Sequence, residues 1–299
     1  MWEPDPAWHA VAGGTGTSTV GVWRTERRGT ALLVKRLAVP AADDPPELTD
    51  PRHFAYWRRE ADVALSGLVD ATPGLRATPV DAAEDDEGIT LVREWVEDAA
   101  LNGLYVAHAL GRFAGADLGR RPWLAVDQLR DRIARVERRG GWPTLARTTV
   151  SDVAHRLWSR RETLLRELDA LPRVPQHGDP ARSNMPGRDG EHVLAIDWAT
   201  VGLGPVGADL GLYLQGSREE AEPLLDAYLL GLPDGVATVE EVSLGMRVSA
   251  AYTALSRAEW ALARVAGGEG ALAGKYRHPA VAPYLRSLQR QFPLVEALL

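Results

Sequence analysis

The chain of 299 residues contains no cysteine. This absence excludes disulfide bonds, thiolate metal sites and cysteine nucleophiles together. No apolar run reaches the ~18 residues that a membrane-spanning helix needs, so we expect no membrane segment. Residues 1–6 have neither the basic region nor the apolar core that a secretory signal carries. We therefore expect a cytoplasmic protein.

An excess of positive charge is also missing. The chain has 41 acidic and 34 basic residues, which gives a formal net charge of −7. Proteins that bind nucleic acid usually present a basic face, so we expect no nucleic-acid partner. Apolar residues make up 45% of the chain and charged residues 25%, as in ordinary globular proteins. The length allows one large domain or two lobes around a cleft.

The N-terminal third is rich in strand-forming segments. Short runs of β-branched and apolar residues predict strands at residues 8–12, 20–23, 31–34 and 89–92. Glycine-containing sequences predict turns at residues 13–16 and 27–30. Between these strands, the apolar spacing predicts one helix from about Phe54 to Leu68, with Glu60 in its middle.

The remaining two thirds are mainly helical in pattern. Apolar residues at helical spacing predict helices that contain residues 129–136, 153–168, 224–230 and 242–265. One strand-like segment, residues 193–196, interrupts them. The pattern as a whole predicts an α+β protein with a strand-rich lobe followed by a larger helical lobe.

One ordered set of polar residues carries the chemistry. His177-Gly178-Asp179 is followed by Asn184, five residues after the aspartate, and then by Asp197. Phosphoryl transfer needs an acidic group that orients and deprotonates the attacking hydroxyl, and oxygen ligands that hold Mg²⁺ against the nucleotide phosphates. A tight loop with Asp and Asn, a turn at residues 186–190 and a strand ending in a second Asp supply both.

The alternative is that these residues have no shared role. His-Gly-Asp is then a surface turn, and Ile196-Asp197-Trp198 is the end of an ordinary strand. Either tripeptide alone favours that interpretation. The ordered set His177, Asp179, Asn184 and Asp197 favours a kinase site, because this spacing suits its two metal ligands and its base.

The same motif resembles the aminoglycoside phosphotransferase family, whose relatives include the protein kinases and the choline and homoserine kinases. The resemblance implies a protein-kinase-like bilobal fold, with a small antiparallel-sheet lobe and a larger helical lobe. It implies ATP and Mg²⁺ as cofactors, Asp179 as catalytic base, and Asn184 and Asp197 as magnesium ligands. It further implies that His177 and Asp209 support the catalytic loop. The alternative for Asp209 is a helix N-cap.

A kinase of this kind also needs a lysine for the nucleotide phosphates and a helical glutamate that positions it. Lys35 ends the apolar run at residues 31–34, and Glu60 follows in the predicted helix. We therefore expect Lys35 and Glu60 to pair. Arg36 is the competing residue, but neighbouring residues of a strand point to opposite faces. The alternative for Lys35 is a solvated strand end.

The glycine-rich turn is the expected lid over ATP. We expect Gly14, Gly16, Thr17 and Ser18 near the phosphates, by resemblance to the family's loose loop. A third glycine of a G-x-G-x-x-G pattern is absent, because position 19 is threonine. The alternative is a simple β-turn.

The segment at residues 91–96 resembles the family's strand that leads to the hinge. Adenine is expected to bind backbone groups near Glu94 and Val96. The resemblance extends over residues 12–209. It divides the chain into a nucleotide-binding lobe at residues 1–96, a hinge at about 93–98 and a helical lobe at 97–299.

Three residues near the catalytic loop depart from the family pattern. Pro180, Met185 and Pro186 stand where the family usually has other apolar residues. They change the backbone of the loop but leave its charged groups in place. The acceptor subgroup is therefore harder to infer than the chemistry.

The expected acceptor is a hydroxyl of an antibiotic, a sugar or an amino alcohol, bound by a monomer or homodimer. Several acidic residues could meet an amine, although each is also typical of a solvated surface: Glu97, Asp98, Glu219, Glu220 and Glu259. Trp123, Trp198 and Trp260 could stack on an acceptor, but core packing is the favoured interpretation. The alternative functions are an ATP-binding regulatory pseudokinase and a metal-dependent hydrolase. The scattered histidines argue against the hydrolase.

Overall fold

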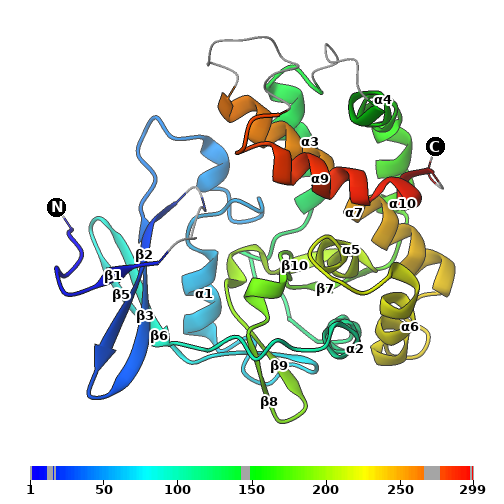
Figure 1. Cartoon of the computed structure of the whole chain (residues 1–299). Coiled ribbons are helices and arrows are strands. Elements are labelled where there is room, and N and C mark those ends of the chain that lie inside the picture. The colour runs from blue at the N-terminus through cyan, green and yellow to red at the C-terminus, as the bar shows by residue number, and fades with distance from the viewer. Residues whose placement is uncertain are drawn as a thin grey trace.

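The computed structural model describes residues 2–11, 16, 18–142, 149–265, 277–296 and 298. A small lobe built on one sheet stands beside a larger helical lobe (Figure 1). The sheet is antiparallel, in the order β1-β2-β3-β6-β5. Its strands are β1 (His9–Ala10), β2 (Thr19–Arg27), β3 (Thr30–Ala38), β5 (Val80–Asp85) and β6 (Gly88–Glu94).

Helix α1 (Arg59–Ser66) lies beside this sheet and faces the large lobe (Figure 1). On its sheet side, Ala61 packs in a small apolar cluster with Leu37, Ile89 and Leu91. The helix begins later than the sequence predicted. Its expected first turn is irregular, because the carbonyls of Pro51, His53 and Phe54 accept hydrogen bonds from the Arg59 guanidinium.

The large lobe contains two further small sheets, which lie around the candidate site. A three-stranded sheet has the order β4-β9-β8, and a two-stranded sheet pairs β7 with β10. Their strands are β4 (Leu75–Ala77), β7 (Arg173–Gln176), β8 (Gly187–Asp189), β9 (His192–Ala195) and β10 (Gly202–Pro205). Because β4 pairs in parallel with β9, an early segment of the chain is fixed to the lobe that carries the catalytic loop.

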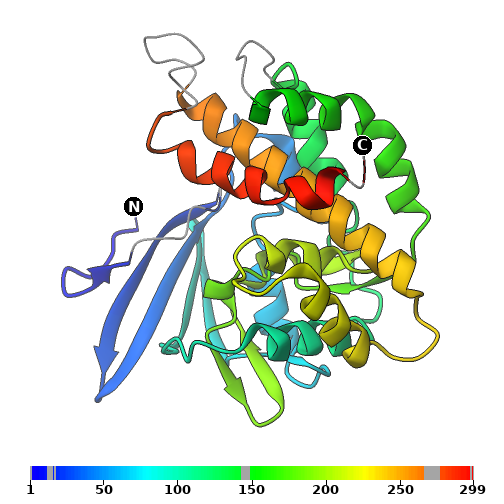
Figure 2. The same ribbon diagram turned by 45° about the vertical axis from the view of Figure 1, so that its right-hand side comes forward.

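A short helix, η1 (Pro46–Leu48), lies between β3 and α1. The other helices of the described residues are α2 (Gly103–Phe113), α3 (Gln128–Arg138), α4 (Thr149–Asp169), η2 (Arg182–Asn184), η3 (Trp198–Thr200), α5 (Ala208–Leu214), α6 (Ala221–Gly231), α7 (Val239–Val265), α9 (Ala282–Arg290) and α10 (Phe292–Glu296). Figure 2 shows the long helix α7 crossing the lobe, with α9 lying along it. A side chain at Gly211 of α5 would collide with the Met246 carbonyl of α7, so glycine allows these two helices to pack closely.

Most of the predicted elements are present. The segments 20–23, 31–34 and 89–92 lie within β2, β3 and β6, and the predicted helices lie within α3, α4, α6 and α7. The turn expected at 186–190 was placed too early, since residues 187–189 form β8 and the chain reverses at Gly190. Strands β4, β5, β7, β8 and β10 were not predicted. Among the described residues, no helix is both long enough and apolar enough to cross a membrane.

Candidate active site

Asp209 fixes the backbone of residues 177–184, the catalytic-loop segment that follows β7. Its Oδ2 accepts a hydrogen bond from the His177 N–H at 2.7 Å, and its Oδ1 accepts one from the Gly178 N–H at 2.9 Å. Burial raises the pKa of Asp209 to about 7, against the opposing effect of these two donors. The N-cap alternative for Asp209 is wrong, because Gly207 is the N-cap of α5.

The first residues of the loop also contact the segment that follows β9. The buried His177 ring has its Nε2 3.0 Å from the Ile196 carbonyl oxygen, and its ring centroid lies 4.5 Å from that of Trp198. Gly178 has φ +83°, and a Cβ there would collide with the Thr200 carbonyl. A glycine at this position therefore allows the catalytic loop and the Asp197 segment to approach closely.

Asp179 and Asn184 lie on one side of the loop. The Asn184 Nδ2 donates to the Asp179 backbone carbonyl at 2.9 Å, which leaves the Asn184 Oδ1 available as a ligand. The Asp179 carboxylate is partly exposed, and its Oδ1 accepts from an Nη2 of Arg257 at 2.8 Å. Arg257 belongs to α7, so the catalytic-loop aspartate contacts a helix that follows it by 78 residues.

The ion pair expected between Lys35 and Glu60 is present. The Lys35 Nζ lies 2.6 Å from the Glu60 Oε2 and 2.8 Å from the Asp197 Oδ1. Asp197 has a left-handed backbone conformation, with φ 62°, which is uncommon for a residue other than glycine. One ammonium group therefore joins a strand and a helix of the small lobe to the segment after β9.

The charges of Lys35, Glu60 and Asp197 influence each other strongly. Burial favours a lower pKa for Lys35, but Glu60 and Asp197 outweigh it and raise that pKa. Lys35 in turn lowers the pKa of Asp197. Arg36 points to the other face of β3, as expected, where its Nη2 pairs with the Asp85 Oδ1 at 2.6 Å.

The expected phosphate loop is only partly described. Gly16 and Ser18 line the same cavity as Lys35. Gly14 and Thr17 lie outside the described residues. The backbone at this point is close to β3, because the Ala38 N–H donates to the Ser18 carbonyl at 2.8 Å.

Glu94 and Val96, the residues expected at the hinge, lie at the end of β6 and just after it. Glu94 ends β6, pairs with Leu32 of β3 and is exposed. Val96 is partly buried beside Gly187 of β8. Neither residue is among those that line the cavity.

A cavity of about 560 Å³ brings the other predicted residues together. Its lining includes Lys35, Glu60, Asp179, Asn184 and Asp197. These residues come from β3, α1, the catalytic loop and the segment after β9. The volume lies within the usual range for small-molecule sites. Of these five residues, Lys35 and Asp197 are the farthest apart in sequence, by 162 positions.

Sequence reasoning missed the arginines that line the same cavity. Arg132, Arg135 and Arg139 come from α3 and the residue after it, and Arg257 comes from α7. The first three have i, i+3, i+7 spacing, which places them on one helical face. That spacing was a usable signal, but it is also typical of a solvated helix.

The sequence was compared with known families and structures. A family model described as the phosphotransferase enzyme family matches residues 9–241. The chain belongs to this family. The expected aminoglycoside phosphotransferase relationship is thereby confirmed. No curated protein matched the sequence.

Solved structures of small-molecule kinases and of an aminoglycoside phosphotransferase are similar to this fold. A choline/ethanolamine kinase family protein from Mesorhizobium loti is 17% identical, with a TM-score of 0.56 over 95% of this chain and 92% of that chain. Amicoumacin kinase hAmiN, solved with AMP-PNP and Ca²⁺, is 13% identical, with a TM-score of 0.60 over 99% and 93%. Aminoglycoside phosphotransferase APH(3'')-Id from Streptomyces rimosus, solved with ADP and streptomycin, is 18% identical, with a TM-score of 0.52 over 83% and 93%. The protein-kinase-like bilobal fold is therefore confirmed.

The departures of this phosphotransferase from the family pattern lie in its interior. Pro180, Met185 and Pro186 are all buried, and Met185 belongs to the main apolar core. The Pro186 carbonyl accepts from the Ala99 N–H at 2.7 Å. These residues pack in the protein interior, and none of the three lines the cavity.

Of the acidic residues considered for an amine, only Glu259 lines the cavity of the phosphotransferase. It is buried and paired with Arg139 at 3.0 Å, so its interpretation as a solvated charge is wrong. Glu219 accepts from the Gly103 N–H at the start of α2. Among the tryptophans, Trp198 is a core residue, whereas Trp260 both packs on the core and lines the cavity.

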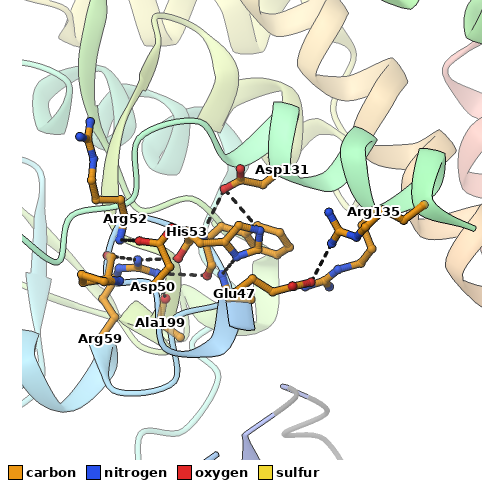
Figure 3. A network of polar contacts seen from close by, with 12 residues as sticks. Glu47, Asp50, Arg52, His53, Arg59, Asp131, Arg135 and Ala199 are labelled. Atoms are coloured by element: carbon orange, nitrogen blue, oxygen red, sulfur yellow. Dashed lines mark hydrogen bonds and ion pairs between the residues drawn. The ribbon is translucent and has the colours of Figure 1, made fainter. Parts of the chain in front are cut away.

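A network of polar contacts lies around Arg59, the first residue of α1 (Figure 3). Arg59 is fully buried and donates five hydrogen bonds, all to backbone carbonyls. One acceptor is Ala199, two residues after Asp197 (Figure 3). Burial lowers the pKa of Arg59 to about 10. The residue before Glu60 thus fixes the start of α1 to the segment that carries Asp197.

His53 lies in the same network and gives a testable pH dependence. Burial, followed by the charge of Arg135, lowers the pKa of His53 to about 4. As the pH falls, the unfolded chain takes up this proton first, so folding stability is lost between about pH 6.5 and 4. We expect His53→Asn to reduce this loss by about 1–2 kcal/mol between pH 7 and 5. Asparagine retains an acceptor for the Ala55 N–H, which His53 Nδ1 accepts at 3.1 Å.

Urea unfolding of both proteins at several pH values checks this expectation. Burial raises the pKa of the neighbouring Asp131 to about 6, which has the opposite effect on stability as the pH falls. Because the His53 Nε2 lies 3.7 Å from the Asp131 Oδ2, the same comparison is made with Asp131→Asn in both proteins, which separates the two groups. Parallel stability curves would contradict the assignment.

Proposed function

We propose that this chain is an ATP- and Mg²⁺-dependent kinase that transfers the γ-phosphate to a hydroxyl group of a small molecule. The observation that supports this most is the Lys35 contact with both Glu60 and Asp197, in the cavity that Asp179 also lines. This arrangement is what a phosphoryl-transfer site needs: a cation for the phosphates, an oxygen ligand for metal and a carboxylate for the acceptor.

The side chains present fit a magnesium ion. Lys35 contacts one oxygen of Asp197, which leaves the other free to coordinate, and the Oδ1 of Asn184 is also free of its internal hydrogen bond. Mg²⁺ prefers oxygen ligands and is often held by one or two protein groups together with substrate phosphates. We assign Asn184 and Asp197 to this role. Bound Mg²⁺ would neutralise charge that develops on the phosphates.

In the proposed reaction, Asp179 orients the acceptor hydroxyl and takes its proton. A bond forms between the acceptor oxygen and the γ-phosphorus, the bond from that phosphorus to the bridging oxygen breaks, and ADP leaves with those electrons. Lys35 holds the α- and β-phosphates, and Glu60 holds Lys35. Gly14, Gly16, Thr17 and Ser18 are proposed to cover the phosphates. His177 and Asp209 keep the catalytic loop in position.

We further propose a hinge at about residues 93–98, between a lobe at 1–96 and a lobe at 97–299. Strand β6 ends at Glu94, and the next helix, α2, begins at Gly103. The intervening backbone near Glu94 and Val96 is free of regular structure after β6 and is proposed to bind adenine. A cytoplasmic location suits a kinase that uses ATP.

The test of the proposed function is MgATP binding by Asp197→Asn. Loss of one carboxylate charge should weaken magnesium-dependent ATP binding by at least ~10-fold. Isothermal titration with and without Mg²⁺ measures this effect, and a chelator added to the unmodified protein should reproduce it. The matched control is Asp189→Asn, at the end of β8, where the carboxylate is exposed and pairs with Arg76 at 2.6 Å.

Equal MgATP affinity in Asp197→Asn and in the unmodified protein would contradict the metal assignment. Tight MgATP binding without transfer to any hydroxyl compound, across antibiotics, sugars and amino alcohols, would instead support the pseudokinase alternative.

A further inference from the structure

The acceptor side of the cavity is lined mainly by positive charge. Four guanidinium groups, those of Arg132, Arg135, Arg139 and Arg257, line the cavity on the side of α3 and α7. Apart from Glu60 and Asp197, which contact Lys35, the acidic residues that line it in the described part of the chain are Asp179 and Glu259. The cations therefore outnumber the carboxylates on this side.

Both of these carboxylates already have a partner. Glu259 pairs with Arg139 at 3.0 Å, and Asp179 pairs with Arg257 at 2.8 Å. Arg135 lies 3.8 Å from Glu47, which is closer to the exposed Arg138, at 2.7 Å. Each carboxylate that the described residues offer to an amine in this region therefore has a cation beside it.

Arg132 feels the charges of Asp179 and Asp131, but neither carboxylate pairs with it. Within the part of the chain that the structure describes, its guanidinium has no hydrogen bond and no ion pair. Its centre lies 4.5 Å from the Phe54 ring centroid, which provides a weaker contact. Burial, and next the charge of Arg257, lower the pKa of Arg132 to about 10. A guanidinium beside another guanidinium is stabilised by a bound anion.

Aromatic side chains line the same region. Phe54, Trp57, Trp260 and Tyr284 contribute to the cavity wall. Trp260 and Tyr284 meet edge to face, with ring centroids 6.0 Å apart. This wall suits an acceptor with an apolar or ring-shaped body.

We propose that the acceptor is an anionic hydroxyl compound, whose carboxylate binds Arg132 while its hydroxyl faces Asp179. The assignment rests on the proposed kinase function and names the class of its acceptor. A bidentate Arg132–carboxylate pair gives orientation as well as affinity. Arg257 is placed to contact the same carboxylate or to orient Asp179. Cationic acceptors are excluded by repulsion from the same two arginines.

The test uses matched hydroxyl compounds that differ in charge. One set is 4-(hydroxymethyl)benzoate, benzyl alcohol and 4-(aminomethyl)benzyl alcohol, and another is glucuronate, glucose and glucosamine. ADP formation with MgATP measures transfer, and thermal stabilisation in the presence of MgADP measures binding without turnover. We expect the acid of each set to be preferred over its neutral and cationic counterparts.

Arg132→Gln should reduce kcat/KM or binding for the acids by roughly 10- to 100-fold and leave the neutral compounds unchanged. The KM for ATP should change less than ~2-fold. Arg132→Lys retains the charge without the bidentate geometry and should give an intermediate result. The matched control is Arg130→Gln, on the same helix, where the guanidinium lies outside this cavity and pairs with Asp169 at 3.0 Å.

Three outcomes would overturn the assignment. The first is a preference for the amines, which leaves the kinase function intact. The second is a loss of ATP affinity in Arg132→Gln without an effect on the acids, which would place this arginine at the phosphates. The third is equal binding of acids and neutral compounds throughout, whether or not any of them is phosphorylated. Failure of the kinase function itself is recognised separately, by the MgATP titration of Asp197→Asn.

Discussion

Replacing Asp179 with alanine is expected to lower phosphoryl transfer by roughly 10²–10⁴-fold or more while leaving folding and MgATP binding largely intact. The carboxylate is the group on the catalytic loop that can accept the acceptor's proton. The loop itself is held by other contacts, since Asp209 accepts from the backbone of His177 and Gly178. Removal of the Asp179 side chain therefore leaves its scaffold in place.

A coupled ADP assay and an ATP titration on the same samples separate chemistry from binding. Asp189→Asn serves as the control here too, because it removes an exposed carboxylate close in sequence. Asp179→Ala also leaves Arg257 without its carboxylate partner. For this reason Asp179→Asn should be measured in parallel, because its amide oxygen can still accept from Arg257. Full transfer activity in either variant would rule out Asp179 as the base.

Much of the candidate site could be predicted because its residues are close in sequence or follow a fixed order. Asp179 and Asn184 lie in one loop, and a short hairpin brings the chain back to Asp197. Lys35 and Glu60 lie on a strand and on the helix that follows it. Local periodicity and motif spacing are sufficient to place groups of this kind.

The acceptor side could not be predicted in the same way. Arg132 precedes the catalytic loop and Arg257 follows it, each across several intervening elements. An arginine-rich helical face is typical of solvated helices, and only the packing of α3 against α7 turns it toward Asp179. The charge of the cavity is thus a property of the tertiary structure.

The start of α1 is a second feature that the sequence could not predict. Apolar spacing predicts a helix from about Phe54, yet the helix begins at Arg59. The Phe54 carbonyl, in the expected first turn, accepts from the Arg59 side chain, as do the carbonyls of Pro51 and His53 just before it. A buried side chain that competes with backbone hydrogen bonding leaves no signal in the apolar pattern.

Arg59→Met is expected to destabilise the protein by about 3–5 kcal/mol, because four of its carbonyl acceptors lose their donor, whereas the fifth, that of His53, also accepts from the Tyr56 N–H. Each unsatisfied buried acceptor costs about 1–3 kcal/mol, and water reaching some of them reduces the sum. Urea unfolding monitored by tryptophan fluorescence measures the change. Arg58→Met is the matched control. Arg58 is partly exposed and pairs with Asp62 and Glu84, so its loss should cost at most about 1 kcal/mol.

The functional consequence of losing Arg59 follows from its position. Arg59 binds the Ala199 carbonyl, and the next residue, Glu60, holds Lys35 against Asp197. Loosening Arg59 should therefore change the distance between the helix that carries Glu60 and the segment that carries Asp197, the proposed metal ligand. We expect Arg59→Lys, which keeps the charge but provides fewer donors, to remain folded and to bind MgATP more weakly than the Arg58→Met control. Unchanged MgATP affinity in a folded Arg59→Lys variant would show that Arg59 stabilises the fold without positioning the site.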